Sequence, residues 1–530
     1  MKMNARMIVR VVVVVAAIGY FSWQTWGRQH PQPHAQVVTG TAGTTPVRPA
    51  KPVKPAPPAT LRMGRLTLTA CALQQPGSAV TTPAYCTVFR VPENRADPEA
   101  RTIELKLAIV KSDSEVPDQD LVVYLAGGPG QSAIQSYPEL APAFAPLLKR
   151  HDVLLLDQRG TGGSHPLDCP TAQKALSRLT GTATSAQLAD QVRACATEVE
   201  KTADPRDYTT TDAVADLDAV RRALGAPRLD LVGVSYGTRV AQHYAAAHPD
   251  AVRGMVLDGV VPNELVLGET FARTLQRSLQ LQAAACSAAP ACKGAFGDWY
   301  ATLYTLYARL KAQPPHAATF ADPRSFKPVT ETLDADTLAG VVRMFSYSTA
   351  TAALLPLAVT EATHGNDAPL LGQSRILSAD LSQSVQGGMQ LSVICTEDAP
   401  LLTPRPQDAG LLLGGNFIQD LAAECGAWPH GPMPAGFHAP FQASIPTLLV
   451  SGERDPVTPP AFAAQVLKGL SDGRSLVVKG LGHAEAINAG CMPRLVARFI
   501  DKLQPKTLDA QCLKRLGPLP AFVTFNGAAP

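Results

Sequence analysis

Residues 229–250, LDLVGVSYGTRVAQHYAAAHPD, contain a serine whose neighbours suit it for nucleophilic chemistry. Ser235 follows a run of strand-forming aliphatic residues and precedes a segment of helical character. A strand that enters a helix through one residue must reverse sharply, which exposes that side chain at the edge of a sheet. Gly233 and Gly237 leave room for so tight a turn because they carry no side chain. The pattern G-x-S-x-G in this context predicts a nucleophile elbow with Ser235 at its tip.

A serine hydroxyl needs a base that takes its proton, and the base needs an acid that fixes its tautomer. In enzymes with a nucleophile elbow, the partners follow in the order serine, acid, histidine. Asp455 lies in the loop after the strand-like segment IPTLLV, and His483 lies in the loop after RSLVV. We expect both loops to open on the sheet edge that carries Ser235, with Asp455 as the acid and His483 as the base.

Two other carboxylates compete with Asp455 for the role of the acid. Asp258 in MVLDGVVP ends an earlier strand, and some enzymes of this kind carry the acid there. Its alternative role is that of a turn residue before Gly259. Glu453 lies two residues before Asp455 and is expected to point elsewhere. The comparison of Asp455→Asn with Asp258→Asn would separate these interpretations.

Attack on a carbonyl creates an oxyanion, which needs backbone N–H donors already in place. Tyr236, directly after the nucleophile, would supply one donor at a helix N-terminus, whose dipole favours negative charge. The loop GGPG after LVVYLA would supply the other, and we predict the N–H of Gly128. A phosphate-binding loop is the alternative for these glycines, but neither G-K-[ST] nor G-x-G-x-x-G follows them.

The elements that must position these residues alternate between strands and helices. YCTVFRVPEN and TIELKLAIV predict antiparallel entry strands, whereas six aliphatic runs from DLVVYLA to RSLVV predict a parallel sheet buried on both faces. Between residues 262 and 440 helical segments replace the strands, which predicts a cap over the C-terminal edge of the sheet. The expected class is α/β, a mostly parallel sheet with helices on both faces, in which residues 61–261 and 441–530 form the core and residues 262–440 an inserted, mainly helical cap.

The N-terminal region predicts export. Within residues 1–30, three basic side chains precede VVVVVAAIGYF, an apolar stretch of signal-peptide length, and retention of this segment as a membrane anchor is the alternative. Residues 31–60 contain spaced prolines and predict an extended linker. The expected location is the periplasm or the exterior, with a membrane tether if the segment stays uncleaved.

Charge and cysteine usage restrict the partners. The formal net charge is +3, but residues 1–60 hold seven Lys or Arg and no Asp or Glu, so the remainder carries 3 − 7 = −4, and no nucleic-acid-binding face is implied.

The ten cysteines favour disulfides in an exported chain. Their spacing offers no zinc site, since no C-x-x-C pair occurs, and no metal or cofactor is expected. Pairing of sequence neighbours suggests five bonds: Cys71–Cys86, Cys169–Cys195, Cys286–Cys292, Cys395–Cys425 and Cys491–Cys512.

Five motifs occur in a familiar order: GGPG at 127–130, DQRGTG at 157–162, GVSYGT at 233–238, DPVTP at 455–459 and GHAE at 482–485. This set resembles the α/β-hydrolase serine exopeptidases, namely proline iminopeptidase and the secreted tripeptidyl aminopeptidases. The resemblance covers most of residues 61–530 and is closer to the secreted branch, because of the cysteines, the long cap and the extended C-terminal part. It implies hydrolysis of peptide bonds near a free N-terminus through an acyl-enzyme on Ser235. Ala126 departs from the pattern, since some relatives have histidine or glycine there.

An exopeptidase of this kind must recognise the free amine of its peptide substrate, which an anionic group in the cap could do. Glu397 and Asp398 in LSVICTEDAP are the first candidates, because relatives carry an acidic residue shortly after a cysteine in a similar place, here Cys395. Glu264 and Glu269, at the entrance of the cap, are further candidates. The alternative is that Glu397 and Asp398 are solvated charges.

Two other functions stay open. A carboxylesterase could use the same scaffold, although GGPG and DQRG disfavour it. A catalytically inactive hydrolase fold that serves in binding is the third interpretation, against which the intact set of Ser235, Asp455 and His483 argues.

Overall fold

The computed structural model describes residues 59–99, 101–170, 184–414 and 417–525. The predicted signal segment and nearly all of the predicted linker lie outside these ranges. Within them, no helix combines the length and the apolar character that a membrane span requires.

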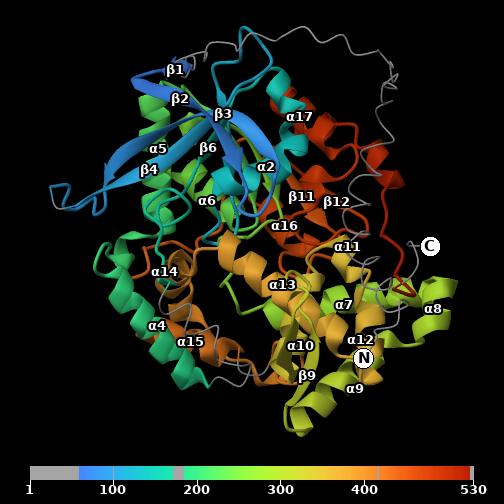
Figure 1. Ribbon diagram of the computed structural model, residues 1–530. Helices are drawn as coiled ribbons and strands as arrows, with labels where there is room; N and C mark the ends of the chain where they lie inside the picture. Colours follow the sequence, from blue (N-terminus) through green and yellow to red (C-terminus); the bar gives the residue numbers. More distant parts are fainter. Residues whose placement is uncertain (1–58, 100, 171–183, 415–416, 526–530) are drawn as a thin grey trace, which may run out of the picture.

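A ten-stranded sheet runs through the molecule in the order β1-β2-β3-β4-β6-β5-β7-β8-β11-β12 (Figure 1). Its antiparallel part consists of β1 (Thr60–Met63), β2 (Leu66–Gln74), β3 (Thr81–Pro92) and β4 (Thr102–Val110), the last of which also pairs antiparallel with β6. The parallel part consists of β5 (Leu121–Leu125), β6 (Val153–Leu156), β7 (Leu229–Val234), β8 (Val252–Asp258), β11 (Thr447–Gly452) and β12 (Gly473–Val478). The predicted sheet with antiparallel entry strands is confirmed.

Helices cover both faces of the sheet. One layer contains α5 (Thr210–Leu224), α6 (Tyr236–Ala247) and α16 (Pro460–Leu467), and the other contains α2 (Ala133–Phe144) and α17 (Met492–Lys502). Successive residues of one strand serve different layers: Val123 packs in the first hydrophobic cluster and Val122 in the second. The parallel strands are continuous aliphatic runs because both of their faces are buried.

Between β8 and β11 the chain leaves the sheet and forms the cap. Its helices are α7 (Phe271–Ala288), α8 (Pro290–Phe296), α9 (Trp299–Ala312), α10 (Ala335–Phe345), α11 (Thr349–Ala352), α12 (Leu355–Thr363), α13 (Ala368–Ser384), α14 (Gly387–Glu397) and α15 (Phe417–Ala427). Helices α7, α8, α9, α10, α12 and α13 enclose a hydrophobic core of their own, with Trp299 and Phe345 among its buried members. The buried residues of α14 and α15 instead join the hydrophobic cluster beneath the sheet. Helix α4 (Ser185–Val199), inserted after β6, packs on α15 and extends this layer (Figure 1).

The cap also contains a hairpin that the sequence did not predict. Strands β9 (His316–Ala321) and β10 (Pro328–Leu333) pair with each other in a separate two-stranded sheet. Half of β9 is alanine, which has low strand propensity, so the segment HAATFA carries little local signal for a strand.

Five disulfides join the same pairs that sequence neighbourhood suggests. Cys71–Cys86 links β2 to β3, and Cys395–Cys425 links α14 to α15. Beyond α17 the C-terminal part returns to the cap, where the backbone N–H of Phe522 donates to the carbonyl of Ala353 over 2.9 Å. The end of the described chain therefore connects the core with the cap.

Candidate active site

Ser235 occupies the turn between β7 and α6. Its φ of 55° and ψ of −123° form a strained conformation that residues other than glycine rarely adopt. The backbone N–H of Ser235 donates to the carbonyl of Asp258 over 2.8 Å, which attaches the turn to the neighbouring strand β8. A Cβ added to Gly237 would lie 2.1 Å from the carbonyl oxygen of Leu125, and one added to Gly233 would lie 2.6 Å from that of Gly237. Both positions therefore require glycine, as the elbow pattern predicts.

His483 and Asp455 reach the same sheet edge from the loops after β12 and β11. Nε2 of His483 lies 2.9 Å from Oγ of Ser235, and Nδ1 lies 2.8 Å from Oδ2 of Asp455. The Asp455 side chain is buried, and His483 is 9% exposed. The structure thus brings the three predicted residues into one hydrogen-bonded chain, in which the imidazole can take the proton of the hydroxyl.

Asp455 is stabilised as a carboxylate by the turn that follows it. The backbone N–H groups of Val457 and Thr458 donate to Oδ1 over 2.8 Å and 2.7 Å, and the Thr458 hydroxyl donates to Oδ2 over 2.8 Å. Burial alone would raise the pKa of Asp455, but His483 and these backbone donors outweigh it, and the pKa is lowered. An ionised Asp455 holds a proton on Nδ1 and leaves Nε2 free to accept one.

Thr458 also lies 3.0 Å from Nδ1 of His483, so its hydroxyl touches both partners of the acid–base pair. No role for Thr458 is predicted from the sequence, although it belongs to the motif DPVTP. A partial signal was present, because aspartate side chains in turns accept hydrogen bonds from the backbone of the residues that follow them.

The competing acids make other contacts. Asp258 is fully buried at the end of β8, where Oδ2 accepts the N–H of Ile487 over 2.8 Å and Oδ1 has no partner among the residues described. Burial raises the pKa of Asp258 to about 7. Oε2 of Glu453 accepts the N–H of Gly480 over 2.9 Å. Of the three carboxylates, Asp455 is the one that hydrogen-bonds to the imidazole.

Tyr236 and the GGPG loop, which are predicted to supply the oxyanion donors, both border Ser235. Tyr236 begins α6, and an N–H in the first turn of a helix has no acceptor within the helix. In the GGPG loop, Gly127 comes so close that an added Cβ would lie 3.1 Å from Cβ of Ser235, and Gly128 has a φ of +108°. The loop therefore borders the nucleophile, and the assignment of the Gly128 N–H as the second donor stays a prediction.

The motif DQRGTG supports this loop without touching Ser235. The buried Asp157 accepts hydrogen bonds from the hydroxyl of Ser132 over 2.6 Å and from the N–H of Ile134 over 3.0 Å, at the start of α2. Arg159, also buried, forms an ion pair with Asp216 over 2.7 Å. The motif fixes the start of α2, and with it the loop between β5 and α2, against the end of β6.

Tyr347, between α10 and α11, connects the cap with the loop of the candidate base. The backbone N–H of His483 donates to the Tyr347 carbonyl over 2.7 Å, and the two rings meet edge to face with centroids 5.1 Å apart. A Cβ added to Gly482 would lie 2.1 Å from that same carbonyl oxygen. No sequence pattern marks Tyr347, because its role depends on the packing of two distant segments.

Glu397 and Asp398 are fully buried and bonded to protein groups. Glu397 accepts the N–H of Thr210 over 2.6 Å and its hydroxyl over 2.8 Å, and burial raises the pKa of Glu397 to about 8. Asp398 forms a buried ion pair with Arg239 over 3.0 Å. The Thr210 hydroxyl also lies 2.6 Å from the hydroxyl of Tyr236, so Glu397 is connected through Thr210 to the side chain of the residue after Ser235. This placement does not favour either residue for recognising a substrate amine, because both carboxylates are buried and already bonded to protein groups. The sequence did not reveal this, since the burial of an acid depends on tertiary packing.

Glu264 and Glu269, the two further candidates at the entrance of the cap, are partly exposed. Oε1 of Glu264 accepts Nε2 of Gln465 over 3.0 Å. The carboxylate of Glu269 makes no hydrogen bond and no ion pair with any residue that the structure describes, and it lines a cavity of about 280 Å³ beside Phe417. Of the four acids predicted as candidates for amine recognition, Glu269 is the one that is partly exposed and has no side-chain partner in the described part of the chain.

Among the described residues, Asp118, His151 and Asp501 have ligand atoms close enough together for a metal ion. Nε2 of His151 lies 3.0 Å from Asp501, and Nδ1 lies 3.4 Å from Asp118, so each ring nitrogen faces a carboxylate. Arg150 pairs with Asp118 over 3.4 Å. His151 precedes β6, at the sheet edge opposite to Ser235, and the group is a set of ion pairs remote from the candidate site.

Comparison of the sequence with known proteins identifies a family and several relatives. A family model described as alpha/beta hydrolase fold matches residues 120–487. Tripeptidyl aminopeptidase of Streptomyces lividans is 31% identical over 191 residues, which cover 34% of this chain and 36% of that protein. Proline iminopeptidase of Neisseria gonorrhoeae is 33% identical over 148 residues, which cover 28% of this chain and 35% of that protein. Serine protease Hip1 of Mycobacterium tuberculosis is 25% identical over 469 residues, which cover 82% of this chain and 88% of that protein. The match thus spans about a third of the length of the first two relatives and most of the third.

Proposed function

This chain belongs to the alpha/beta hydrolase fold family, and from that premise we propose that it is an exported serine aminopeptidase. It would cleave peptides near their free N-terminus and release single residues or short peptides. The observation that carries the proposal is the hydrogen-bonded chain of Ser235, His483 and Asp455 beside a glycine-rich loop. The names of the relatives, tripeptidyl aminopeptidase and proline iminopeptidase, support peptide bonds as the substrate class.

The proposed reaction uses these groups in sequence. As Oγ of Ser235 attacks the scissile carbonyl, Nε2 of His483 takes its proton, and ionised Asp455 stabilises the imidazolium. The N–H groups of Tyr236 and Gly128 would hold the oxyanion. His483 then protonates the leaving amine, which leaves an acyl-enzyme on Ser235. A water molecule, activated by the same imidazole, hydrolyses this ester and frees the N-terminal residue or short peptide as a carboxylic acid, while the shortened peptide has already left as the amine.

Recognition of the free N-terminus requires an anionic group in the cap, and Glu269 is the residue that we propose. An ammonium group of the substrate would give its unpaired carboxylate a charge-assisted hydrogen bond. Glu264 is already engaged with Gln465, and Glu397 and Asp398 are buried.

Export is supported by the cysteines. All ten cysteines form disulfides, and bonds of this kind persist in oxidising compartments. We propose that residues 1–30 direct the chain to the periplasm or the exterior, either as a cleaved signal or as an anchor. Mass analysis of the N-terminus of protein recovered from cells would distinguish the two.

A panel of chromogenic amides tests the proposed activity. The substrates carry one, two or three residues before the reporter, each with a free or an acetylated amine, and short-chain esters complete the panel. An aminopeptidase cleaves the free-amine amides and leaves the acetylated ones. Ester turnover without amide cleavage would instead show a carboxylesterase, and failure of a fluorophosphonate to label Ser235 would show an inactive hydrolase fold.

A further inference from the structure

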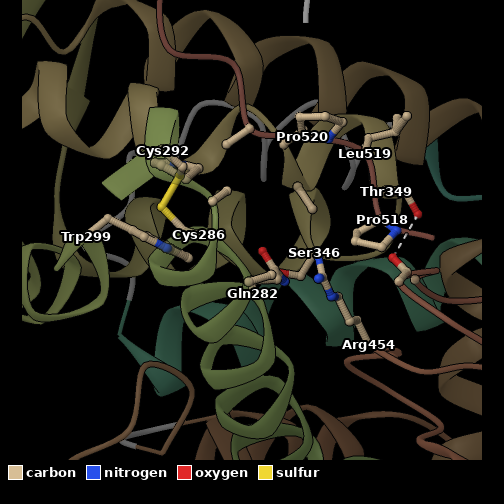
Figure 2. A pocket seen from close by; sticks show the side chains of 18 residues that line it. Gln282, Cys286, Cys292, Trp299, Ser346, Thr349, Arg454, Pro518, Leu519 and Pro520 are labelled. Atoms are coloured by element: carbon tan, nitrogen blue, oxygen red, sulfur yellow. Dashed lines mark hydrogen bonds between the residues drawn. A yellow bond between two sulfur atoms is a disulfide. The ribbon is translucent and has the colours of Figure 1, made fainter. Parts of the chain in front are cut away.

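A cavity of about 220 Å³ adjoins the loops that carry Asp455 and His483, and Figure 2 shows the side chains that line it. Its wall includes Arg454 and Gly482, which immediately precede those two residues in the chain. The cap helices α7, α11 and α12 and residues 518–521 form much of the rest. None of the three proposed catalytic residues lines it, so the cavity is distinct from the candidate active site.

Arg454 contributes an uncompensated cation to this cavity. Its guanidinium makes no hydrogen bond and no ion pair with any residue in the described ranges, and Figure 2 shows the side chain directed toward Gln282 and Ser346. Burial lowers the pKa of Arg454, while Glu453 acts in the opposite direction. A partly desolvated cation without a partner is unfavourable, so an anion beside it would be stabilised.

Two further polar groups in the wall have unmet hydrogen-bonding capacity. Nε2 of Gln282 donates to the hydroxyl oxygens of Ser278 and Ser346 over 3.2 Å and 3.3 Å, and each of these hydroxyls donates its own hydrogen to a backbone carbonyl. The amide orientation is thereby fixed, which leaves Oε1 without a described partner. The indole N–H of Trp299, a side chain only 1% exposed, likewise has none in the described part of the chain.

The remaining wall suits a hydrocarbon. Small and apolar residues from the cap and the C-terminal part line it, namely Ala285, Ala353, Pro356, Pro518, Leu519 and Ala521. One guanidinium in such surroundings favours a monoanion, and a planar carboxylate can accept two of its N–H donors at once. A phosphate dianion would bring a second charge that no other cation of this wall compensates.

We propose that this cavity binds a short-chain monocarboxylate, with its carboxylate on Arg454 and its hydrocarbon against the alanines and prolines. A cavity of about 150 Å³ accommodates benzene, so about 220 Å³ accommodates roughly nine non-hydrogen atoms. Hexanoate, with about eight, is a suitable probe. The bound acid is not a substrate, because the cavity holds neither the nucleophile nor the base.

Calorimetric titration of the full chain with hexanoate tests the proposal. We expect saturable binding below about 10 mM, both for the wild type and for Ser235→Ala, since the site does not involve the nucleophile. The neutral isostere hexanamide should bind at least about tenfold more weakly. Arg454→Gln should lose about tenfold or more in affinity, whereas Arg90→Gln, at a side chain 75% exposed, should leave it unchanged.

Ala285→Leu provides a second variant, which fills the cavity and keeps Arg454. It should abolish binding, and thermal unfolding of each variant shows whether it is folded. The proposal is overturned by the absence of saturable heat in the wild type, by equal affinities for hexanoate and hexanamide, or by unchanged binding in either folded cavity variant. Loss of binding in Ser235→Ala would place the ligand at the active site and overturn it too.

Discussion

At the scale of single residues, the candidate site contains four buried acids whose surroundings differ. Hydrogen bonds from the turn after β11 and the adjacent His483 lower the pKa of Asp455 despite its burial, whereas the burial of Asp258 and Glu397 raises theirs. Asp398 is paired with an arginine. A carboxylate that must orient an imidazole needs donors around it, and Asp455 has them.

The acid of the proposed triad can be identified by two matched amide variants. Asp455→Asn should lower kcat by about 10⁴-fold, because the amide no longer holds the imidazole in the tautomer that accepts the serine proton. Asp258→Asn should retain activity within a few-fold, since Asp258 bonds to the backbone of Ile487 and not to His483. Hydrolysis of a free-amine chromogenic substrate measures both. The reverse ranking would make Asp258 the acid.

Asp258 should also leave a signature in the pH dependence of stability. Its pKa rises from 3.8 to about 7 on folding, so below pH 3.8 the carboxyl is neutral in both states, and between the two values it is neutral in the folded state alone. Its contribution to stability is therefore fully present at low pH and lost as pH rises through about 7. The loss is on the order of 4 kcal/mol at most.

Urea unfolding of Asp258→Asn at about pH 4 and about pH 8 checks this, because the amide does not titrate. The variant should gain stability relative to the wild type at the higher pH. Asp250→Asn, at an exposed position, should show no such gain. Equal differences at both pH values would mean that Asp258 is ionised in the folded protein throughout.

Glu269→Gln tests the proposed recognition of the substrate amine. Removal of the charge should lower kcat/KM for free-amine substrates by about 10- to 100-fold, the range of a hydrogen bond between charged groups. Unfolding free energy should change little, because the carboxylate has no partner among the described residues. Glu264→Gln, at the acid bonded to Gln465, is the control and should keep kcat/KM. If the Glu269 variant retains full activity, the amine is held elsewhere.

At the scale of elements, the site is made by strand ends. Ser235, Asp455 and His483 each follow a parallel strand, and parallel strands that share a sheet present their C-terminal ends at one edge. This is why three residues spread over 249 positions of sequence, from 235 to 483, could be predicted to meet. Tyr347 and the β9–β10 hairpin could not be predicted in this way. Their roles depend on contacts with segments distant in the sequence, and their own residues carry no local pattern that indicates them.

The glycines of the elbow provide the test at this scale. Gly237→Ala would place Cβ 2.1 Å from a backbone carbonyl oxygen of β5, so it should cost about 3 kcal/mol of unfolding free energy and most of the activity. Gly340→Ala, within α10, meets nothing within 4 Å and should be neutral or stabilising by up to about 1 kcal/mol. Denaturant unfolding and hydrolysis assays measure both. Wild-type stability and activity in Gly237→Ala would refute the close approach.

At the scale of the whole molecule, the five disulfides and the cap were predictable to different degrees. Each disulfide closes a short loop, from 6 residues for Cys286–Cys292 to 30 for Cys395–Cys425, so pairing of sequence neighbours found all of them. The cap was predictable because helical segments replace the regular series of strands between residues 262 and 440. The sequence did not reveal which acids the cap would bury, because Glu397 and Asp398 look like any exposed pair until α14 is packed against α5 and α6.

The hydrogen bond from His483 to the carbonyl of Tyr347 has a consequence for the size of substrate that this molecule can process. This hydrogen bond joins the cap to the backbone of the proposed general base, so a movement of the cap wide enough to admit a folded domain would break the bond and displace His483. An extended peptide terminus needs less space and could enter while this hydrogen bond stays intact. A compact protein with an ordered N-terminus should therefore remain uncut during incubation with this protein. The same protein in unfolded form should be shortened from its N-terminus, as mass spectrometry would record. Equal shortening of both forms would mean that the hydrogen bond between His483 and Tyr347 opens freely.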